Sequence, residues 1–455
     1  MEKSKLRLGA FLLGVGHHVA AWRYPKAQAS GGIHFDYYRK LAQTAERGKF
    51  DMIFFADGLA TWDRGQGTAA AGRSALSGGF EPLTLLSALS AVTEHIGLTA
   101  TVSTTYNEPY HLARKFASLD HLSGGRAGWN LVTSATEAEA KNFSKEAHME
   151  HTLRYERARE FVEVVTKLWD SWEDDPFLYD KEAGIFFESE KLHVTAHQGK
   201  HFSVHGPLNV IRPPQGYPVI IQAGSSEDGQ NLAAQTAEVV FTAQQTLEEA
   251  QTFYAGLKSR LAQFGRTPDQ LKVMPGVFPV IGRTEQEAKE KYAQLQELIH
   301  PSIGLSLLSA LVGGVDLSSY PLDGPLPELP ETNGQKSRLK LVTDLATREN
   351  LSIRQLYESI AGARGHRTIL GTPEQIADQL EDWFVHGGAD GFNIMPPYLP
   401  GGLDEFVDLV IPELQRRELF RTEYEGTTLR ENLGLQRPVN QFTTSKSTTR
   451  PPAAV

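Results

Sequence analysis

Small polar residues that directly follow an apolar run are the first feature of this sequence that could carry chemistry. The segment 223–226 (Ala-Gly-Ser-Ser) follows the apolar run 219–222 and precedes a helical pattern. Small residues at a helix N-terminus leave backbone N–H groups free for an anion, and serine hydroxyls add donors. Gly224, Ser225 and Ser226 are therefore a candidate phosphate site, with a plain helix cap as the alternative.

Polar side chains also follow two other apolar runs. Asp57 comes after the run 53–56, and the run 129–134 carries Asn130 and ends on Ser134. In a barrel of parallel strands, polar groups at the carboxyl ends of the strands lie on the functional face. A helix cap or a loop hydrogen bond is the alternative for each of these residues.

Two other patterns resemble known sites but do not fit them. Histidines recur every four residues at 193, 197, 201 and 205, which on a helix would make a metal-binding stripe. Glycines at 199 and 206 and several β-branched residues between them favour turns and short strands. We therefore expect a surface hairpin and assign no metal. The Gly-Val-Gly at 14–16 lacks the third glycine of a dinucleotide loop, and no P-loop is present.

The composition excludes several classes of function. The chain has no cysteine, so disulfides, thiolate catalysis and iron–sulfur clusters are ruled out. Acidic residues outnumber basic ones by 55 to 45, and this charge argues against a nucleic-acid-binding face. The apolar run 6–15 is too short and too interrupted to span a membrane. We expect a cytoplasmic protein.

Short apolar runs alternate with helical patterns along the chain, as in the helix predicted at 153–169. Strict alternation of strands and helices predicts a parallel sheet. Eight such units favour a closed (β/α)8 TIM barrel over an open, doubly wound sheet. The predicted strands are 6–13, 52–56, 96–102, 127–132, 219–223, 239–242, 273–281 and 391–395.

Three stretches interrupt this alternation, near 58–81, 170–218 and 300–362, and they are rich in glycine, proline or small residues. Loops of a barrel build its active site, so we interpret these insertions as candidates for a lid and a pocket. Residues 1–435 are predicted to form a single barrel domain. Residues 436–455, rich in Thr, Ser and Pro, are predicted to be a flexible tail.

A set of short stretches matches one known family: 16–17, 22–25, 46–51, 55–57, 103–110, 119–121, 125–126, 129–134, 151 with 154–155, 222–226, 390–393 and the segment 394–403. Together they resemble the bacterial luciferase-like flavin monooxygenases, in the branch of nitrilotriacetate monooxygenase component A. The resemblance runs from about residue 6 to about residue 435.

This resemblance implies an FMN site at the carboxyl ends of the barrel strands. Tyr155 and Ser226 would donate to the phosphate, together with the helix N-terminus. His151 would bond a phosphate or ribityl oxygen. By matching positions, the flavin contacts are Asp57, Thr101, Ser134, His151, Tyr155 and Ser226, to which we add Asn130 from its place at a strand end.

The resemblance further implies a two-component oxygenase. An NAD(P)H:flavin reductase would supply FMNH2, and molecular oxygen would form a flavin C4a-hydroperoxide that oxidises a small organic substrate. His17 is our candidate for bonding the peroxyflavin or acting as acid or base, with His18 or a purely structural role as alternatives. The resemblance also implies a homodimer or homotetramer.

The substrate is the least defined part of this interpretation. Trp62 stands where the alkane-oxidising relative has a tyrosine, so alkane hydroxylation is not supported. An amino-polycarboxylate, cleaved at a C–N bond, or an organosulfur acid would need cationic contacts. Arg73, Arg364, His366 and Arg367 could supply them, or could be solvated charges or neighbours of the FMN phosphate. A deazaflavin- or flavin-dependent reductase or dehydrogenase and a non-catalytic flavin carrier are the competing functions.

Overall fold

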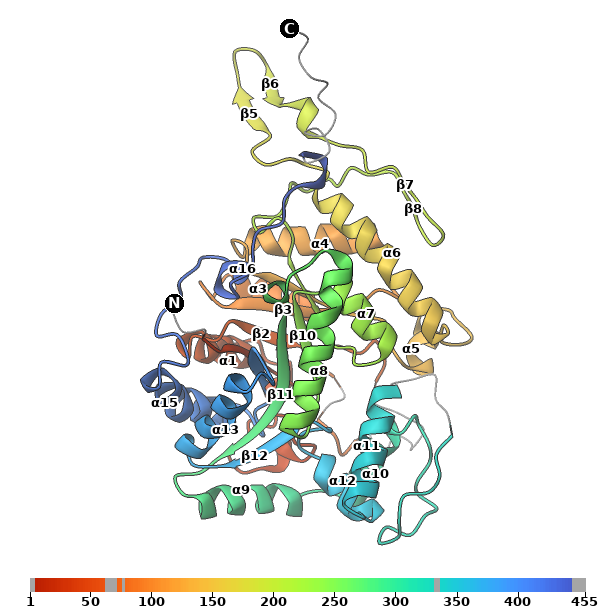
Figure 1. The fold of residues 1–455 in the computed structure, drawn as a ribbon, viewed down its shortest axis with the longest axis vertical. Helices are drawn as coiled ribbons and strands as arrows, with labels where there is room; N and C mark the ends of the chain where they lie inside the picture. The colour runs from red at the N-terminus through yellow and green to blue at the C-terminus, as the bar shows by residue number, and fades with distance from the viewer. Residues whose placement is uncertain (1–4, 62–71, 76–77, 331–335, 444–455) are drawn as a thin grey trace.

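The computed structural model describes residues 5–61, 72–75, 78–330 and 336–443 of the chain. Its centre is a closed ring of parallel strands, which confirms the predicted (β/α)8 barrel (Figure 1). Around the ring lie β1 (Arg7–Phe11), β2 (Met52–Phe55), β3 (Gly97–Ser103), β4 (Ala127–Val132), β9 (Val219–Gln222), β10 (Val239–Thr242), β11 (Lys272–Ile281) and β13 (Gly391–Ile394). The pairing of β13 with both β11 and β1 closes the ring.

Helices cover the outside of this ring, and their ends follow the capping signals of the sequence. Thr372 accepts from the backbone N–H of Gln375, and Pro373 occupies the first turn of α13. Within the described residues the covering helices are α1 (Phe35–Arg47), α3 (Pro82–Ser90), α4 (Pro109–Leu122), α5 (Glu137–Asn142), α6 (His151–Trp169), α7 (Glu227–Thr236), α8 (Leu247–Arg260), α9 (Glu285–Glu297), α13 (Pro373–Val385), α14 (Gly401–Glu405) and α15 (Ile411–Arg416).

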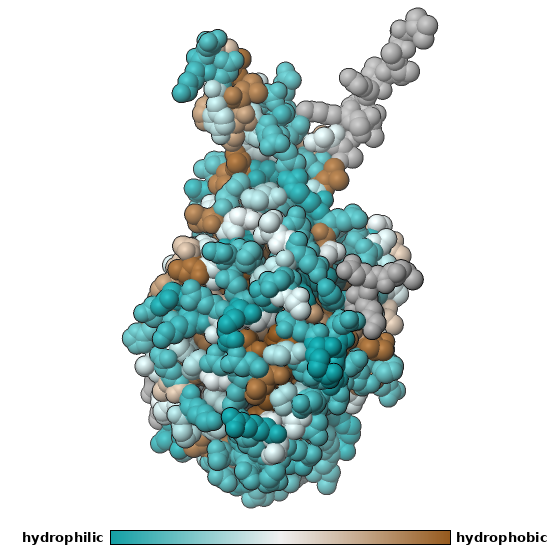
Figure 2. Space-filling model, turned by 90° about the vertical axis from the view of Figure 1, so that its left-hand side faces the viewer, coloured by the Kyte–Doolittle hydropathy of each residue, from teal (hydrophilic) through white to brown (hydrophobic). Residues whose placement is uncertain are grey.

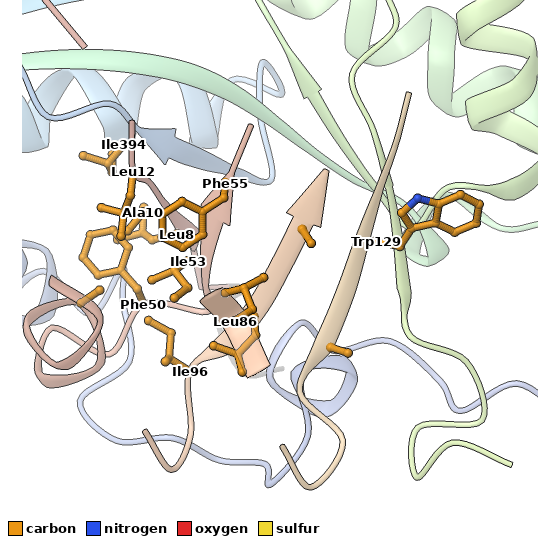
Figure 3. Close-up of a cluster of buried hydrophobic side chains, with 14 of the residues drawn as sticks. Leu8, Ala10, Leu12, Phe50, Ile53, Phe55, Leu86, Ile96, Trp129 and Ile394 are labelled. Carbon is orange, nitrogen blue, oxygen red and sulfur yellow. The ribbon is translucent and has the colours of Figure 1, made fainter. Parts of the chain in front are cut away.

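The strands present alternate residues to two different apolar clusters. Leu8 and Ala10 of β1 and Ile53 of β2 belong to the larger cluster, between the strands and the helices (Figure 3). Phe11 and Phe54 belong to the second cluster, inside the barrel. Because successive side chains of a strand point to opposite faces, a strand buried on both sides is almost continuously apolar.

The short helix α16 (Leu429–Asn432) closes the amino-terminal end of the barrel. Leu429 and Leu433 join the inner cluster. A Cβ on Gly97, the first residue of β3, would lie 2.5 Å from a methyl carbon of Leu429, so this approach requires glycine. Polar groups at the opposite, carboxyl ends of the strands are therefore the ones that surround the barrel mouth.

Much of the insertion 300–362, a candidate for a lid or a pocket, is helical: α10 (Pro301–Leu311), α11 (Lys336–Arg348) and α12 (Ile353–Ile360). These helices share a separate apolar cluster in which Leu307, Leu317 and Leu356 are almost completely buried. After them, β12 (Arg367–Gly371), which the sequence did not predict, pairs with the second half of β11.

The insertion 170–218 forms two hairpins that project from the barrel (Figure 1). One joins β5 (Phe177–Asp180) to β6 (Ile185–Phe187). The other joins β7 (His197–Gln198) to β8 (Ser203–Val204), which confirms the hairpin expected around the spaced histidines. Brown side chains gather on the projecting part in Figure 2, where Leu178, Ile185 and Phe186 are exposed.

The expectation of a flexible tail is wrong for residues 436–443. Asn440 is buried and donates to the carbonyls of Asp170 and Trp172. Phe442 stacks on His193 with ring centroids 4.7 Å apart. These contacts are long-range, so composition alone could not indicate them. Residues 444–455 lie outside the described part of the chain. No helix among the described residues is long and apolar enough to cross a membrane.

A buried ion pair ties the C-terminal segment to the barrel and gives a test of the fold. Asp51 is completely buried, accepts from Arg421 at 2.5 Å and also accepts from the backbone N–H of Leu8. Asp51→Asn leaves the Arg421 charge without its partner and should lower the free energy of unfolding by roughly 3 kcal/mol. Urea unfolding measures this loss. The exposed pair Arg47–Asp408 is the control, because Arg47→Gln should cost less than about 1 kcal/mol.

Candidate active site

A buried polar pair lies on the β3–β4 side of the barrel mouth. The Thr101 hydroxyl donates to the carbonyl of Phe55 at 2.7 Å and accepts from the Asn130 side-chain amide at 2.8 Å. Both residues are about 3% exposed. The Asn130 Oδ1 atom is buried without a hydrogen-bond partner among the described residues. A buried acceptor of this kind costs free energy unless a donor reaches it, and a ligand N–H would meet that need.

Asp57 follows β2 on the same side of the mouth, as predicted, and its side chain is exposed there. Burial by the surrounding chain raises the pKa of its carboxyl to about 6, with smaller contributions from Glu81 and Glu139, while the backbone N–H of Gly58 opposes the rise. The carboxylate is thus an accessible acceptor whose charge the protein disfavours. Perturbed groups of this kind cluster at functional sites.

Ser134 ends the turn after β4 in a conformation that side chains seldom adopt. Its φ is 56°, in the left-handed region, and its hydroxyl donates to the Ser103 hydroxyl at 2.8 Å. Strain in a non-glycine residue persists where the surrounding structure imposes it, often at ligand sites. Ser134 therefore lies beside the end of β3, next in space to the Thr101–Asn130 pair along the same two strands.

The N-terminus of α7 lies beyond β9, where the sequence predicted a phosphate site. Ser226 is its N-cap, and the Ser226 hydroxyl accepts from the backbone N–H of Gly229 at 3.2 Å. The Ser225 hydroxyl lies 3.3 Å from that of Thr242 at the end of β10. A Cβ on Gly224 would lie 2.4 Å from the Gln222 side-chain amide and 3.1 Å from the Gly229 Cα, so a larger residue would crowd the turn. The cap and the phosphate site, set as alternatives by the sequence, are compatible, since one cap bond leaves other first-turn N–H groups unused.

The start of α6 adds two aromatic side chains to this helix end. His151 Nδ1 lies 3.3 Å from Asp228 Oδ2 in the first turn of α7. The His151 and Tyr155 rings are 4.8 Å apart, and Tyr155 is 8% exposed. The structure thus places His151 and Tyr155, at the start of α6, beside the α7 N-terminus with Ser225 and Ser226, although the two helices come from separate parts of the sequence.

Both ring nitrogens of His17, the predicted acid or base, have hydrogen-bond partners within the protein. His17 is completely buried, and its Nε2 donates to the carbonyl of Phe11 at 2.9 Å. Its Nδ1 then accepts from the Arg364 guanidinium at 3.3 Å. Burial, and next the Arg364 charge, hold the pKa of His17 well below its ordinary value. This geometry describes a neutral positioning residue with both ring nitrogens engaged, and it does not favour proton transfer by His17.

His18, the alternative, is engaged in the same way. Its Nε2 lies 3.0 Å from Gln296 Oε1, and its Nδ1 accepts from the backbone N–H of Ala20. Burial lowers its pKa to about 4, so the ring is neutral at neutral pH. Neither histidine presents a free ring nitrogen to the mouth.

The predicted cationic contacts separate into different places. Arg364 and His366 lie at the barrel mouth, whereas Arg367 donates to the side chain of Gln379 and covers the Trp383 ring at 4.5 Å. Arg73 lines a cavity of about 560 Å³ together with Trp22, Arg23 and His300. Trp62 lies outside the described residues. Arg367 therefore stabilises the contact between β12 and α13.

One cationic residue of the mouth was missed by the sequence analysis. Arg338 of α11 donates to His366 Nε2 at 2.7 Å and to the carbonyl of Arg364 at 2.9 Å. It lies near the start of α11, within the insertion 300–362, and follows no strand, so no local pattern indicates that it reaches the barrel.

The comparisons agree with this geometry. The family model described as luciferase-like monooxygenase matches residues 15–391. The chain is 57% identical to N-acetyl-S-(2-succino)cysteine monooxygenase of Bacillus subtilis (strain 168), over 97% of this chain and 99% of the relative. It is 54% identical to nitrilotriacetate monooxygenase component A of Aminobacter aminovorans, over 96% and 98%. A crystal structure of riboflavin lyase with modified FMN and riboflavin superposes with a TM-score of 0.87 and 31% identity, over 96% of this chain and 97% of that one.

The α7 end of the site generates a binding test. Tyr155→Phe and Ser226→Ala each remove a hydroxyl that can donate to a phosphate. Hydrogen bonds to a charged group contribute roughly 1.5–3 kcal/mol, so each change should weaken FMN binding about tenfold or more. Riboflavin, which has no phosphate, should be affected much less. Titration of tryptophan fluorescence measures both affinities.

Ser226→Ala also removes a helix cap, which costs about 1 kcal/mol of stability. Thr372→Ala removes the equivalent cap of α13, away from this helix end, and separates the two effects. Equal losses of FMN and riboflavin affinity in the Tyr155 variant would show that these residues do not hold a phosphate.

The raised pKa of Asp57 generates a second test. A carboxyl whose pKa is about 6 in the folded protein and 3.8 when unfolded binds more protons folded, so it destabilises the fold as pH rises through this range. Asp57→Asn removes that cost. In flavin-free protein, the variant should melt at a higher temperature than the parent near pH 8, and the difference should shrink toward about pH 4. A difference that is the same at both pH values would contradict the assignment.

Proposed function

The chain belongs to the luciferase-like monooxygenase family and is a flavin-dependent oxygenase, and we propose that it is the oxygenase component of a two-component system using reduced FMN and molecular oxygen. The observation that carries the proposal is the unpartnered Asn130 Oδ1 at the same barrel mouth as the α7 N-terminus. The Asn130 Oδ1 atom can accept from a flavin ring N–H, and the N-terminus of α7 can hold the phosphate.

The residues of the site fit FMN in chemical type. Ser225, Ser226 and Tyr155 provide donors for the phosphate, with His151 beside them, and Asp57, Thr101, Asn130 and Ser134 lie at strand ends suited to the ring and the ribityl chain. When bound, reduced flavin supplies the reaction with oxygen by which one oxygen atom is transferred to the substrate. The chain's own task is then to orient the substrate and to exclude water.

The floor of the mouth is suited to excluding water. Phe11, Phe54 and Phe241 contact one another with ring centroids 4.9 to 5.6 Å apart, and each is 6% exposed or less. His17 packs edge-on against Phe11 with centroids 4.4 Å apart. Neutral histidines and aromatic rings at this depth keep the reacting centre dry and free of proton donors of high acidity.

A separate NAD(P)H:flavin reductase is the proposed source of FMNH2. The sequence lacks a dinucleotide loop, and the relative from Aminobacter aminovorans is named as component A of its enzyme. The proposed substrate is a small amino-polycarboxylate or organosulfur acid. The names of the two curated relatives support this class, because nitrilotriacetate and N-acetyl-S-(2-succino)cysteine both carry several carboxyl groups.

We also propose a homodimer or homotetramer. The exposed apolar side chains of the β5–β6 hairpin, Leu178, Ile185 and Phe186, support this proposal, because their burial between copies would be favourable.

The test is a substrate screen with FMN, NADH and a generic flavin reductase under isotopically heavy oxygen. The expected product carries one heavy oxygen atom, and it should form only when reductase, FMN and oxygen are all present. A product without heavy oxygen, or turnover with a reduced deazaflavin in place of FMN, would contradict the proposal in favour of a reductase or dehydrogenase. FMN binding with no product from any carboxylate or organosulfur compound would favour a flavin carrier.

A further inference from the structure

Four nitrogen-bearing side chains form a continuous cluster at the barrel mouth, and we call Arg338, Arg364, His366 and His17 the basic cluster. Arg338 donates to His366 Nε2 and to the Arg364 carbonyl. Arg364 in turn donates to the Nδ1 and the carbonyl of His17, at 3.3 and 3.0 Å. The cluster therefore holds two guanidinium groups close to two neutral imidazoles.

Within the basic cluster, the Arg338 guanidinium has no countercharge among the described residues. No ion pair joins Arg338 to a carboxylate in the described part of the chain. Burial alone lowers the pKa of Arg338 to about 10. Burial also lowers the pKa values of His17 and His366, and the neighbouring cations lower them further, while no acidic group of the described chain opposes this effect. Three almost completely buried arginines differ: Arg421 pairs with Asp51, Arg430 with Glu238 and Arg212 with Asp170.

Arg338 also has few hydrogen-bond acceptors around it, which leaves donors for an anion. Arg126 and Arg266 likewise have no ion pair among the described residues, but several backbone carbonyls accept from each of them. A guanidinium has five N–H donors, but the described contacts of Arg338 are one carbonyl and one histidine nitrogen. Arg338 is only partly exposed, so an anion that reached it would be partly desolvated and strongly held.

The topology places the basic cluster opposite the predicted flavin-ring contacts. Asp57, Thr101 and Asn130 belong to β2, β3 and β4. The basic cluster lies over β10, β11 and β1, because His366 stacks on Phe241 with centroids 4.8 Å apart, approaches Gly276, and connects through Arg364 to His17 beyond β1. In the eight-membered ring β3 and β11 are four strands apart in either direction. A ligand between the two sides would meet ring-binding groups on one side and cations on the other.

We propose that Arg338 and Arg364 bind a carboxylate of the substrate, so that the substrate is a di- or tricarboxylate oriented by this pair. The proposal rests on the proposed oxygenase function and names the residues that select its substrate class. A planar guanidinium matches a carboxylate in two parallel hydrogen bonds, which fixes orientation as well as position. His366 accepts from Arg338, and so holds the guanidinium in place as a positioning residue.

This assignment gives the insertion 300–362 a function in specificity. Arg338 lies on α11, whose position is set by the apolar cluster shared with α10 and α12. Arg364 follows α12 with a φ of 49°, so its backbone is also held in a conformation that few side chains adopt. The insertion thus carries Arg338 and leads directly into Arg364, and a change within it would alter substrate choice while the strand-end residues stay the same.

The experiment compares three variants of the full-length protein. Arg338→Gln removes the charge, Arg338→Lys keeps the charge without the fork, and Arg348→Gln is the control, since Arg348 is on the same helix but faces Glu249 and Glu349. Calorimetric titration measures binding of two polycarboxylates, nitrilotriacetate and N-acetyl-S-(2-succino)cysteine. The methyl esters of the second compound, which lack the carboxylate charges, are titrated as a control. Fluorescence titration measures FMN and riboflavin, and circular dichroism checks the fold.

We expect Arg338→Gln to weaken binding of at least one polycarboxylate about tenfold or more, Arg338→Lys to lose less, and Arg348→Gln to match the parent. The esters should bind weakly to all four proteins. Unchanged polycarboxylate binding in Arg338→Gln would overturn the proposal, as would a parent protein that binds neither acid. A loss of FMN affinity with riboflavin unaffected would show that Arg338 serves the cofactor phosphate, and would also overturn it. Failure of the parent to bind FMN while it binds polycarboxylates would count against the proposed function alone.

Discussion

The hydrogen-bonded ring of eight parallel strands is the constraint on which the rest of the structure depends. Because every strand runs in the same direction, all their carboxyl ends meet at one mouth, and residues far apart in sequence become neighbours there. The α16 helix closes the other end with Leu429 and Leu433. The Asp51 carboxylate links the two ends of the chain, because it accepts from the backbone N–H of Leu8 in β1 and from the Arg421 guanidinium.

The electrostatics of the mouth follow from what lies on each side of the ring. On the β2–β4 side, a carboxyl of raised pKa and a carboxamide with a free oxygen offer acceptors. On the β10–β11–β1 side, burial and, to a smaller extent, neighbouring guanidinium groups hold the pKa values of His17 and His366 well below the ordinary value, so both rings are neutral. In the proposed arrangement, the acceptors face the flavin ring and the guanidinium groups face an anionic substrate, so the two ligands do not compete for the same contacts.

The insertion with α10–α12 and the barrel itself provide different parts of the proposed site. The residues proposed to bind the cofactor lie at strand ends and helix caps that depend on the barrel itself, whereas α10–α12 share their own apolar cluster and add Arg338 at one edge of the mouth. A unit with its own core can change without loss of the barrel. This separation explains in physical terms how similar barrels come to oxidise different substrates, as the different names of the two curated relatives illustrate.

The sequence by itself determined the eight strands, most helix boundaries and the polar residues at strand ends that we propose to bind the cofactor. These features leave local signals: apolar runs for buried strands, capping residues such as Thr372, and Gly224 with its serines before α7. It also indicated the hairpin around the spaced histidines, because glycines and β-branched residues act locally.

Only the tertiary structure decided which of the polar residues are available. His17 looked like a catalytic group by position, but its two ring nitrogens are engaged by Phe11 and Arg364, and Arg364 is distant in sequence. Arg367 is three residues from Arg364 and yet packs on Trp383, while Arg338, unremarked in the sequence, reaches the mouth from a separate helical unit. The ordered segment 436–443 depends in the same way on Asp170 and Trp172. Local patterns determine elements, but the partners of a charge are set by long-range packing, and those partners decide whether the charge stabilises the fold or remains free to bind a ligand.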